Sequence, residues 1–371
     1  MSNKQKLIGA NRLDASLSIR DGASNYIVAH ILQYILQFLL TIVLIATDVS
    51  SEFSKTIAYT IIIVLVNMFA NAITPLGYSK VLGQNYYKDM GFKKKLSVYQ
   101  ILILFVIGIL TVCAFAPIAN MFVNWIYSLG YKAGTSIVVN GLGQYIAFIF
   151  LLAIAPAFVE EILYRGMVAR SFKSKNYIFA IFVSAAIFAL MHGNPIQLVF
   201  QFFIAIVCAV VYFSTHSIYA PVIIHATGNL VSITGNYITT VNNITTIAEG
   251  YLIGAEVVGI LLLPIALYFF IKFSNKERWT LIKSEKDWSK KFDLMFITDK
   301  EMKIKEDKEA LVKANLEKLD SQEAKEIYLN QVKDVEKKNN STDTKALILA
   351  IFLCAAIWIL QTLMGFGVIS S

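Results

Sequence analysis

The chain has 371 residues, of which 57% are hydrophobic and only 16% are charged. This composition leaves too little polar surface for a soluble globular protein, and it predicts a polytopic membrane protein. The net charge of +8 does not indicate a nucleic-acid partner, because Lys and Arg lie between apolar runs or in one charged segment, without a patch of interleaved aromatic residues.

Nine apolar runs have about the length of a helix that crosses the hydrocarbon layer, which takes about 20 residues. We therefore expect an all-α, polytopic transmembrane helix bundle of about nine spans, with the stretch Pro156–Lys173 between the fourth and the fifth. The expected spans are Tyr26–Thr47, Ile57–Leu76, Ser97–Val123, Ile137–Ala155, Tyr177–His192, Ile196–Phe213, Ile218–Gly235, Tyr251–Phe273 and Ala346–Phe366.

Lys and Arg gather in alternate connections between these runs. The N-terminal segment, the second loop, the segment after the fourth span and the segment 274–345 are rich in them, whereas Asp48–Lys55, Val123–Ser136 and Asn236–Gly250 have one or none. Because basic residues favour the cytoplasmic side, this pattern predicts a cytoplasmic N-terminus. The first 25 residues are polar and precede a full-length span, so we expect no cleavable signal peptide.

The first candidate site residues lie in the stretch that follows the fourth span. Glu160, Glu161 and Arg165 are surrounded by apolar residues. Ionised side chains at bilayer depth cost several kcal/mol by roughly any scale, so they are rare and usually functional. Residues four apart share a helix face, so Glu161 and Arg165 are expected to pair.

Histidines supply the remaining candidates. Of four in the chain, His192 ends the fifth span and His225 lies inside the seventh, four residues before Asn229 on the same helix face. If the helices around residues 174–176 form an antiparallel hairpin, Glu160 and His192 reach a similar depth. His30, His216 and Glu256 fit no such pattern and are expected to serve packing or span ends.

Two chemistries fit this set. A carboxylate beside an imidazole can activate a water molecule, while a second imidazole and an amide stabilise an oxyanion. Alternatively, Glu160, His192 and His225 hold a divalent metal such as zinc, with its bound water as the nucleophile. The sequence has no HExxH motif, no GxSxG serine and no aspartate pair in its spans, which argues against zincin-type, serine and aspartyl proteases.

Three motifs occur in order on successive expected helices: Glu160-Glu161-x-x-x-Arg165, Phe188-x-x-x-His192 and His225-x-x-x-Asn229. They resemble the motifs of the CPBP family, which contains CAAX proteases and bacteriocin-processing enzymes and is also called the Abi family. The resemblance covers about Ile137–Gly235. It implies an intramembrane endopeptidase with Glu160 as the water-activating base, His192 as its partner, His225 and Asn229 on the oxyanion side, and Glu161 with Arg165 as a supporting pair.

The resemblance leaves metal dependence open, because members are often named metalloproteases while the eukaryotic prenyl-protein endopeptidase branch favours a metal-independent glutamate. The apolar runs and charged segments, together with the extent of the resemblance, divide the chain into six expected parts. These are residues 1–25, a cytoplasmic segment; 26–136, N-terminal transmembrane helices; 137–235, the CPBP catalytic core; 236–273, the eighth span and its preceding loop; 274–345, a charged cytoplasmic segment of exposed helices; and 346–371, a C-terminal span.

Other functions remain open at this stage. A non-catalytic immunity or scaffold protein of the same fold would act by binding a partner, and a transporter would use membrane carboxylates as proton sites, although no inverted repeat supports this. For an endopeptidase, the expected partners are the lipid bilayer and a membrane-bound protein or peptide: a CAAX tail, a pheromone, a bacteriocin leader or a membrane-protein segment. The Lys-, Asn- and Ile-rich composition favours a bacterial plasma membrane. The oligomeric state stays open.

Overall fold

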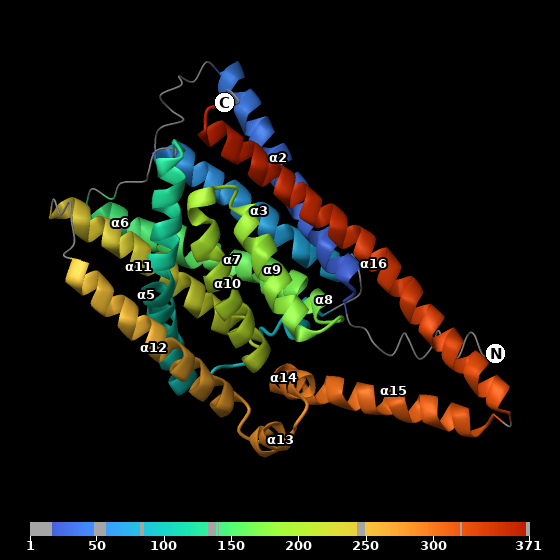
Figure 1. The fold of residues 1–371 in the computed structure, drawn as a ribbon. Coiled ribbons are helices and arrows are strands. Elements are labelled where there is room, and N and C mark those ends of the chain that lie inside the picture. Colours follow the sequence, from blue (N-terminus) through green and yellow to red (C-terminus); the bar gives the residue numbers. More distant parts are fainter. Residues whose placement is uncertain are drawn as a thin grey trace.

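The structure is a computed structural model, and it describes residues 17–47, 57–81, 85–132, 139, 141–242, 249–319 and 321–368. The expected loop Asp48–Lys55 and the first 16 residues of the expected N-terminal segment lie outside these ranges. All regular structure among the described residues is helical, which confirms the all-α bundle (Figure 1). Its elements are α2 (Ile19–Ala46), α3 (Ile57–Val81), α4 (Tyr86–Asp89), α5 (Val98–Ser128), α6 (Leu142–Phe148), η2 (Ile149–Ile154), α7 (Ala155–Glu161), η3 (Ile162–Ala169), α8 (Arg170–Phe172), α9 (Tyr177–Met191), α10 (Pro195–Thr215), α11 (Tyr219–Val241), α12 (Glu249–Ser274), α13 (Trp279–Ser284), α14 (Trp288–Phe296), α15 (Asp299–Glu317) and α16 (Gln322–Gly365).

Among the described residues, seven helical runs are long and apolar enough to cross a membrane. Two of the nine expected spans are not among them. Helix α9 has only 15 residues, or about 22 Å, which is shorter than a hydrocarbon layer of about 30 Å. Helix α11 has 23 residues but carries several polar groups along its length. The number nine therefore stays a prediction, while the polytopic membrane bundle is supported.

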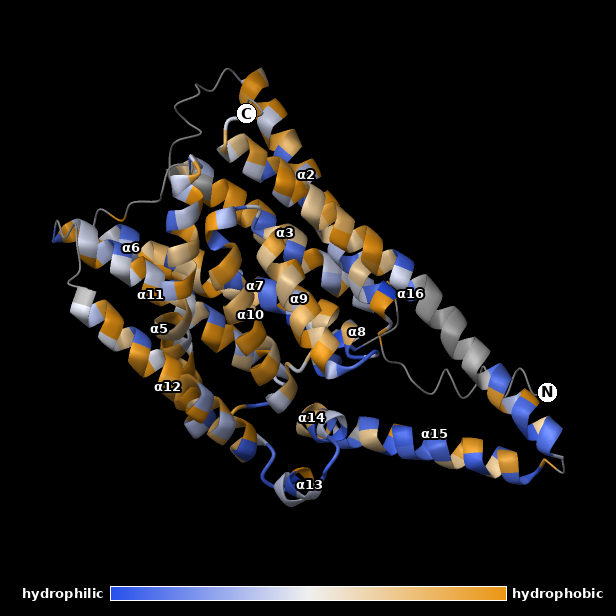
Figure 2. Ribbon diagram, viewed as in Figure 1, coloured by the Kyte–Doolittle hydropathy of each residue, from blue (hydrophilic) through white to orange (hydrophobic). Residues whose placement is uncertain are grey.

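The helices surround a central group that carries the motifs. Helix α5 packs against α12 on one side of the bundle, and α2 packs against α3 and α16 on the other, with the run α6 to α8 and helices α9, α10 and α11 between them (Figure 1). Figure 2 shows that the long helices are mostly hydrophobic, whereas α15 and the described start of α16 are mostly hydrophilic. Helix α10 and the run that carries the two glutamates are the most buried of the seven membrane-spanning segments.

The helical run from Leu142 to Phe172 differs from the expectation. The fourth span was expected to end at Ala155, with a separate stretch after it, but α6, η2, α7, η3 and α8 follow one another without a break. Pro156 does not end the run. It lies two residues after the π-helical segment η2, and local π-helical adjustment accommodates a proline inside a membrane helix. Glu160 and Glu161 therefore lie within the span.

Helix α16 crosses the expected boundary at residues 345 and 346 as one helix of 44 residues, about 66 Å long. Its part from Asp343 to Gly365 is apolar enough to cross a membrane, and its earlier part extends beyond the bundle toward the end of α15 (Figure 1). Charged and apolar residues share one helix because neither Pro nor Gly interrupts residues 322–364.

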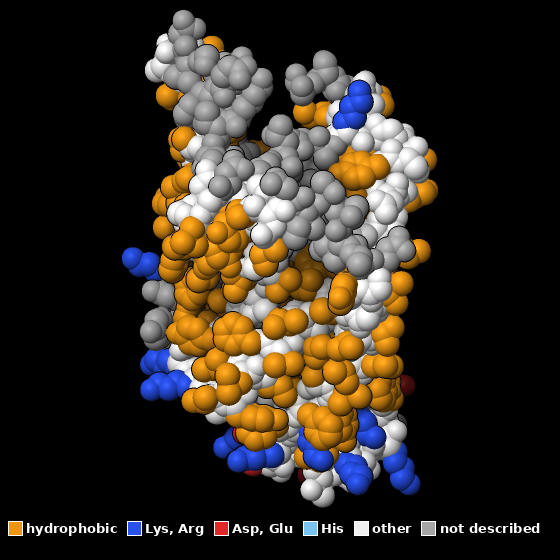
Figure 3. All heavy atoms as spheres, turned by 90° about the vertical axis from the view of Figure 1, so that its left-hand side faces the viewer, with side chains coloured by type: hydrophobic (Ala, Val, Ile, Leu, Met, Phe, Trp, Pro, Cys, Tyr) orange, Lys and Arg blue, Asp and Glu red, His pale blue; other side chains and the backbone are white. Residues whose placement is uncertain are grey.

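One face of the bundle shows how charge is distributed along it. In Figure 3 a broad hydrophobic belt covers the middle, and most described Lys and Arg side chains lie at its lower end, which carries α13 and α14 in Figure 1. This lower end is the side that the basic loops predict to be cytoplasmic.

Candidate active site

The two glutamates end α7, between two π-helical segments, η2 and η3. Single π-helical turns inside α-helices are uncommon and frequently occur at functional sites. Glu161 and the eight residues of η3 are all buried, whereas the Glu160 side chain keeps 18% of its surface exposed. The two adjacent carboxylates therefore have different surroundings.

Glu161 lies in a closed polar cluster. Arg165 Nη1 donates to Glu161 Oε1 at 2.8 Å, which confirms the expected pairing, and Arg165 Nη2 donates to the carbonyl of Ala205 on α10 at 3.0 Å. Glu161 is 0% exposed and Arg165 is 1% exposed. A buried charge of this kind needs a partner, because an uncompensated one costs several kcal/mol, so each residue of the pair stabilises the other's charge.

His225 brings α11 into the same cluster. Its Nδ1 lies 2.9 Å from Glu161 Oε1, and its Nε2 lies 3.9 Å from Glu160 Oε2. Because the Glu161 carboxylate that pairs with Arg165 can only accept, Nδ1 of His225 carries the hydrogen and donates it. In the neutral ring this leaves Nε2 as an acceptor that faces Glu160.

His192 does not take the position expected for it. The sequence placed it next to Glu160, but no contact within ion-pair distance joins these two residues, and the imidazole that faces Glu160 is that of His225. The Nδ1 of His192 instead lies 2.9 Å from the carbonyl of Phe188, one turn earlier on α9. His192 is half-buried, as is Asn229, which lies one turn beyond His225 on α11.

Phe188 connects the parts of the site. Its ring lies edge-on to His192 at 5.0 Å and to His225 at 5.5 Å between centroids, and the Arg165 guanidinium carbon lies 4.8 Å from its centre. Tyr164 packs edge-on against the same ring at 4.9 Å. The aromatic ring therefore fixes the relative positions of the two imidazoles and of the buried cation.

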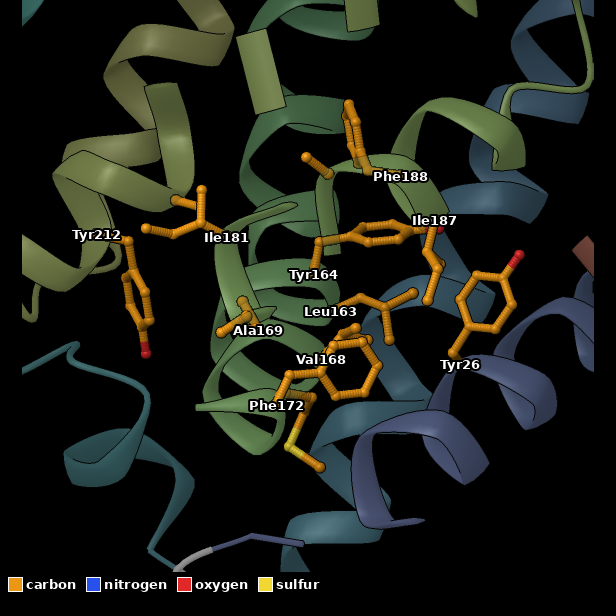
Figure 4. Packing of buried hydrophobic residues seen from close by; sticks show 14 of the residues in the cluster. Tyr26, Leu163, Tyr164, Val168, Ala169, Phe172, Ile181, Ile187, Phe188 and Tyr212 are labelled. Atoms are coloured by element: carbon orange, nitrogen blue, oxygen red, sulfur yellow. The ribbon is translucent and has the colours of Figure 1, made fainter. Parts of the chain in front are cut away.

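Helix α2 also contributes to the surroundings of Tyr164. Figure 4 shows Tyr26 of this helix near Tyr164, with Phe188 on the other side of the Tyr164 ring. The Tyr164 hydroxyl lies 3.5 Å from Nε2 of His30, and the other ring nitrogen of His30 lies 3.0 Å from the carbonyl of Tyr26. His30 was expected only to pack. The structure assigns it a place in the wall behind the site, which no sequence motif marked.

Helix α16 packs against the turn that follows His192. Gly193 has a φ of +62°, which favours glycine, and a Cβ atom there would lie 1.3 Å from the side-chain oxygen of Gln361 on α16. Asn194 caps α10 through Ile196 N and accepts a 3.4 Å hydrogen bond from the Tyr131 hydroxyl. The C-terminal span, which the motifs do not include, thus packs directly on the motif turn.

The expected metal set does not fit this arrangement. Within the described part of the chain, which includes Glu160, His192 and His225, no three His, Cys, Asp or Glu side chains form a group that could hold a metal ion. We therefore derive no step through a metal.

Comparison with known families bears on this cluster directly. Residues 142–231 match the family model described as type II CAAX prenyl endopeptidase Rce1-like. These residues are therefore similar to that family. The match begins where α6 begins and ends two residues beyond Asn229, so it contains all six candidate residues and confirms the resemblance to the CPBP and CAAX protease family. No curated protein and no solved structure matches the chain.

The matched region brings together most of the residues that the sequence selected. Glu160, Glu161, Arg165 and His225 form one contact network, and His192 joins it through Phe188. The contribution of the Phe188 ring was not predicted, although the residue was part of the second motif. The signal that was available is its position four residues before His192, on the same face of α9.

Proposed function

We propose that the protein is an intramembrane endopeptidase in which Glu160 activates the attacking water. The observation that carries this proposal is the contrast between the two carboxylates. Oε1 of Glu161 is occupied by Arg165 and His225. Oε2 of Glu160 and Oε2 of Glu161 both lack a hydrogen-bond partner among the described residues, but that of Glu160 faces the Nε2 of His225 and belongs to a side chain with 18% of its surface exposed. Two carboxylates held in different environments support different roles.

The geometry allows one water to contact both groups. Atoms 3.9 Å apart, as Glu160 Oε2 and His225 Nε2 are, can each reach a water placed beside them at about 2.8 Å. Glu160 takes one proton while the water oxygen attacks the substrate carbonyl carbon, and it then gives that proton to the leaving amine. Nε2 of His225 accepts the other hydrogen of the water and orients its lone pair.

The remaining residues hold this arrangement. Glu161 fixes which nitrogen of His225 carries the hydrogen, so a neutral His225 orients water rather than donating to an oxyanion. The amide of Asn229 is then the donor that we assign to the oxyanion. His192 contacts the ring of Phe188, which also contacts His225. The role of His192 as a partner of Glu160 stays a prediction.

The name of the matched family supports a substrate class, namely a membrane-associated protein that ends in a prenylated CAAX sequence. Peptide pheromones and bacteriocin-related peptides are the other substrates that we consider. The Lys-, Asn- and Ile-rich composition favours a bacterial plasma membrane, and the basic loops favour a cytoplasmic N-terminus with substrate entry from that side. A cysteine placed at Ser321 is then expected to react with an impermeant thiol reagent only after lysis. One placed at Asn243, which lies outside the described residues, is expected to react in intact cells.

The proposal is tested by comparing the peptides released from membranes that contain the natural protein, the Glu160→Gln variant or the Glu277→Gln variant. Glu277 lies at the turn after α12, away from the cluster, and controls for loss of a carboxylate. We expect a set of peptides with shared cleavage sites that requires Glu160 but not Glu277. Equal peptide sets in all three samples would contradict the endopeptidase and favour a protein that acts by binding.

A further inference from the structure

A pocket lies apart from the cluster around Glu160 and Glu161, where the charged segment meets the helix bundle. Its volume is about 280 Å³. The hairpin between α8 and α9 forms one wall, and α14 with the start of α15 forms the other. The lining residues are Leu17, Arg170, Lys173, Ser174, Lys175, Asn176, Tyr177, Asp293, Ile297, Glu301, Ile304 and Lys305.

Specific contacts hold the two walls together. Lys173 forms an ion pair with Glu301 Oε1, and the Tyr177 hydroxyl donates to Glu301 Oε2 at 3.3 Å. Phe296 is 1% exposed and packs against the ring of Tyr177, with 5.7 Å between centroids. The charged segment is therefore docked on the hairpin that directly follows the site helix, and it is not a free tail at this point.

The pocket has a surplus of positive charge. Four basic side chains line it, against the two carboxylates of Asp293 and Glu301. Both oxygens of Glu301 are already used, by Lys173 on one side and by Tyr177 and Thr298 on the other. Lys175 and Lys305 are exposed, and neither forms an ion pair within the described part of the chain.

The position of the pocket indicates the kind of anion. The hairpin precedes the apolar run of α9, which begins at Tyr177, and it lies in the lower part of the bundle in Figure 1. On the face drawn in Figure 3, most Lys and Arg side chains gather at this lower end. Basic pockets beside membrane helices on the cytoplasmic side suit the phosphate groups of anionic lipids. Leu17, Ile297 and Ile304 add apolar surface, which suits the glycerol and upper acyl carbons of a lipid better than a free phosphate ion.

We propose that this pocket binds the phosphate group of an anionic lipid through Lys175 and Lys305. The bound lipid would then strengthen the contact between the charged segment and the hairpin between α8 and α9. A soluble phosphate ester would offer the same anionic group without the acyl chains. The inference does not rest on peptidase activity, because it concerns residues outside the Glu160 cluster.

The test uses the purified full-length protein in a neutral detergent and measures its melting temperature. Dioleoyl phosphatidylglycerol is added to one sample, phosphatidylcholine to a second, and glycerol phosphate at matched ionic strength to a third. Ligands that bind only the folded state raise the melting temperature, here by roughly 2–4 °C near saturation. The same measurements are made on K175Q/K305Q, on the charge-retaining K175R/K305R and on the matched control K290Q, which removes an exposed lysine of α14 outside the pocket.

We expect phosphatidylglycerol alone to raise the melting temperature of the natural protein, K175R/K305R and K290Q, and to lose at least half of that effect in K175Q/K305Q. An equal rise with glycerol phosphate would overturn the lipid as the source of the phosphate. An equal rise with phosphatidylcholine, or a full rise in K175Q/K305Q, would overturn the pocket as a phosphate site. If K175Q/K305Q does not fold, the single variant K175Q is compared with K175R, and equal rises in these two would also overturn the proposal.

Discussion

Glu161 Oε1 lies 2.9 Å from Nδ1 of His225, and this contact joins the helix of the first motif to the helix of the third. The same oxygen accepts from Arg165 at 2.8 Å. One carboxylate oxygen therefore balances a buried guanidinium and orients a buried imidazole. The neighbouring Glu160 is left to face the other nitrogen of the same ring.

Glu161→Gln is expected to cost about 3–5 kcal/mol of folding free energy, because it leaves the buried Arg165 without its counter-charge. The double variant Glu161→Gln/Arg165→Met removes both charges and is expected to recover most of that stability, since a buried pair can be replaced by apolar groups at little cost. Thermal unfolding of the three proteins in detergent measures this difference. Cleavage is expected to fall in both variants, because an amide at position 161 can turn either its oxygen or its N–H toward His225 and no longer fixes which ring nitrogen carries the hydrogen. A double variant no more stable than the single one would contradict the account.

Phe188→Leu is expected to keep the helix but to loosen both imidazoles and to remove the contact with the Arg165 cation. Contacts of this kind contribute about 0.5–2 kcal/mol, so we expect a moderate loss of stability and a larger loss of turnover. Phe182→Leu, on the same helix but with 50% of its surface exposed, is the matched control. Turnover in Phe188→Leu that equals turnover in Phe182→Leu would argue against the role of the ring.

The sequence predicted the membrane helices well because an apolar run of sufficient length is a local property. Two features were less accessible. Pro156 and the charged residues after it resemble the end of a span, yet the run continues, because the π-helical segment before Pro156 accommodates the proline and tertiary contacts satisfy the charges. The continuity of α16 had an available signal, since residues 322–364 contain no helix breaker.

The sequence predicted one contact of the candidate site but not the others. Spacing of four residues was enough to predict the contact between Glu161 and Arg165, because both lie on one helix. Which histidine faces Glu160 depends on how α9 and α11 pack, and depth counted along each helix favoured His192. His30 and Gln361 lie far from the motifs in sequence, so only packing shows that they contact Tyr164 and Gly193.

The docking of the charged segment is expected to depend on pH. Burial alone would raise the pKa of Glu301, but the charge of Lys173 and hydrogen bonds from Lys173 and Thr298 outweigh it and lower that pKa from 4.5 to about 2. A lowered pKa means that this contact contributes stability at pH values above about 4.5, and that the contribution is lost as the pH falls toward 2. Hydrogen exchange in residues 288–317 measures the docking.

At neutral pH, Glu301→Gln is expected to speed exchange in that segment, whereas Asp307→Asn, an exposed change on the same helix, is not. The difference between Glu301→Gln and the natural protein is expected to shrink between pH 4.5 and pH 2. A difference that persists unchanged at pH 2 would show that the Glu301 carboxylate is not the group responsible.

Metal removal separates the two chemistries that the sequence left open. Because Glu160, His192 and His225 do not form a metal-binding group, we expect turnover to survive prolonged treatment with a strong chelator. The measurement is the cleavage rate before and after chelation, with elemental analysis of the treated protein. A rate that falls with chelation and returns on addition of zinc would contradict a metal-free role for Glu160, His192 and His225.

The central claim is that the Glu160 carboxylate removes a proton from the attacking water. The most direct measurement is the single-turnover cleavage rate of a prenylated CAAX reporter peptide by the purified, reconstituted Glu160→Gln protein and by the natural protein. The melting temperatures of the two proteins are compared to show that the variant is folded. Loss of a general base is expected to lower that rate by about 10²–10⁴-fold while folding is retained. A Glu160→Gln rate within a few-fold of the natural rate would contradict the assignment of Glu160 as the base.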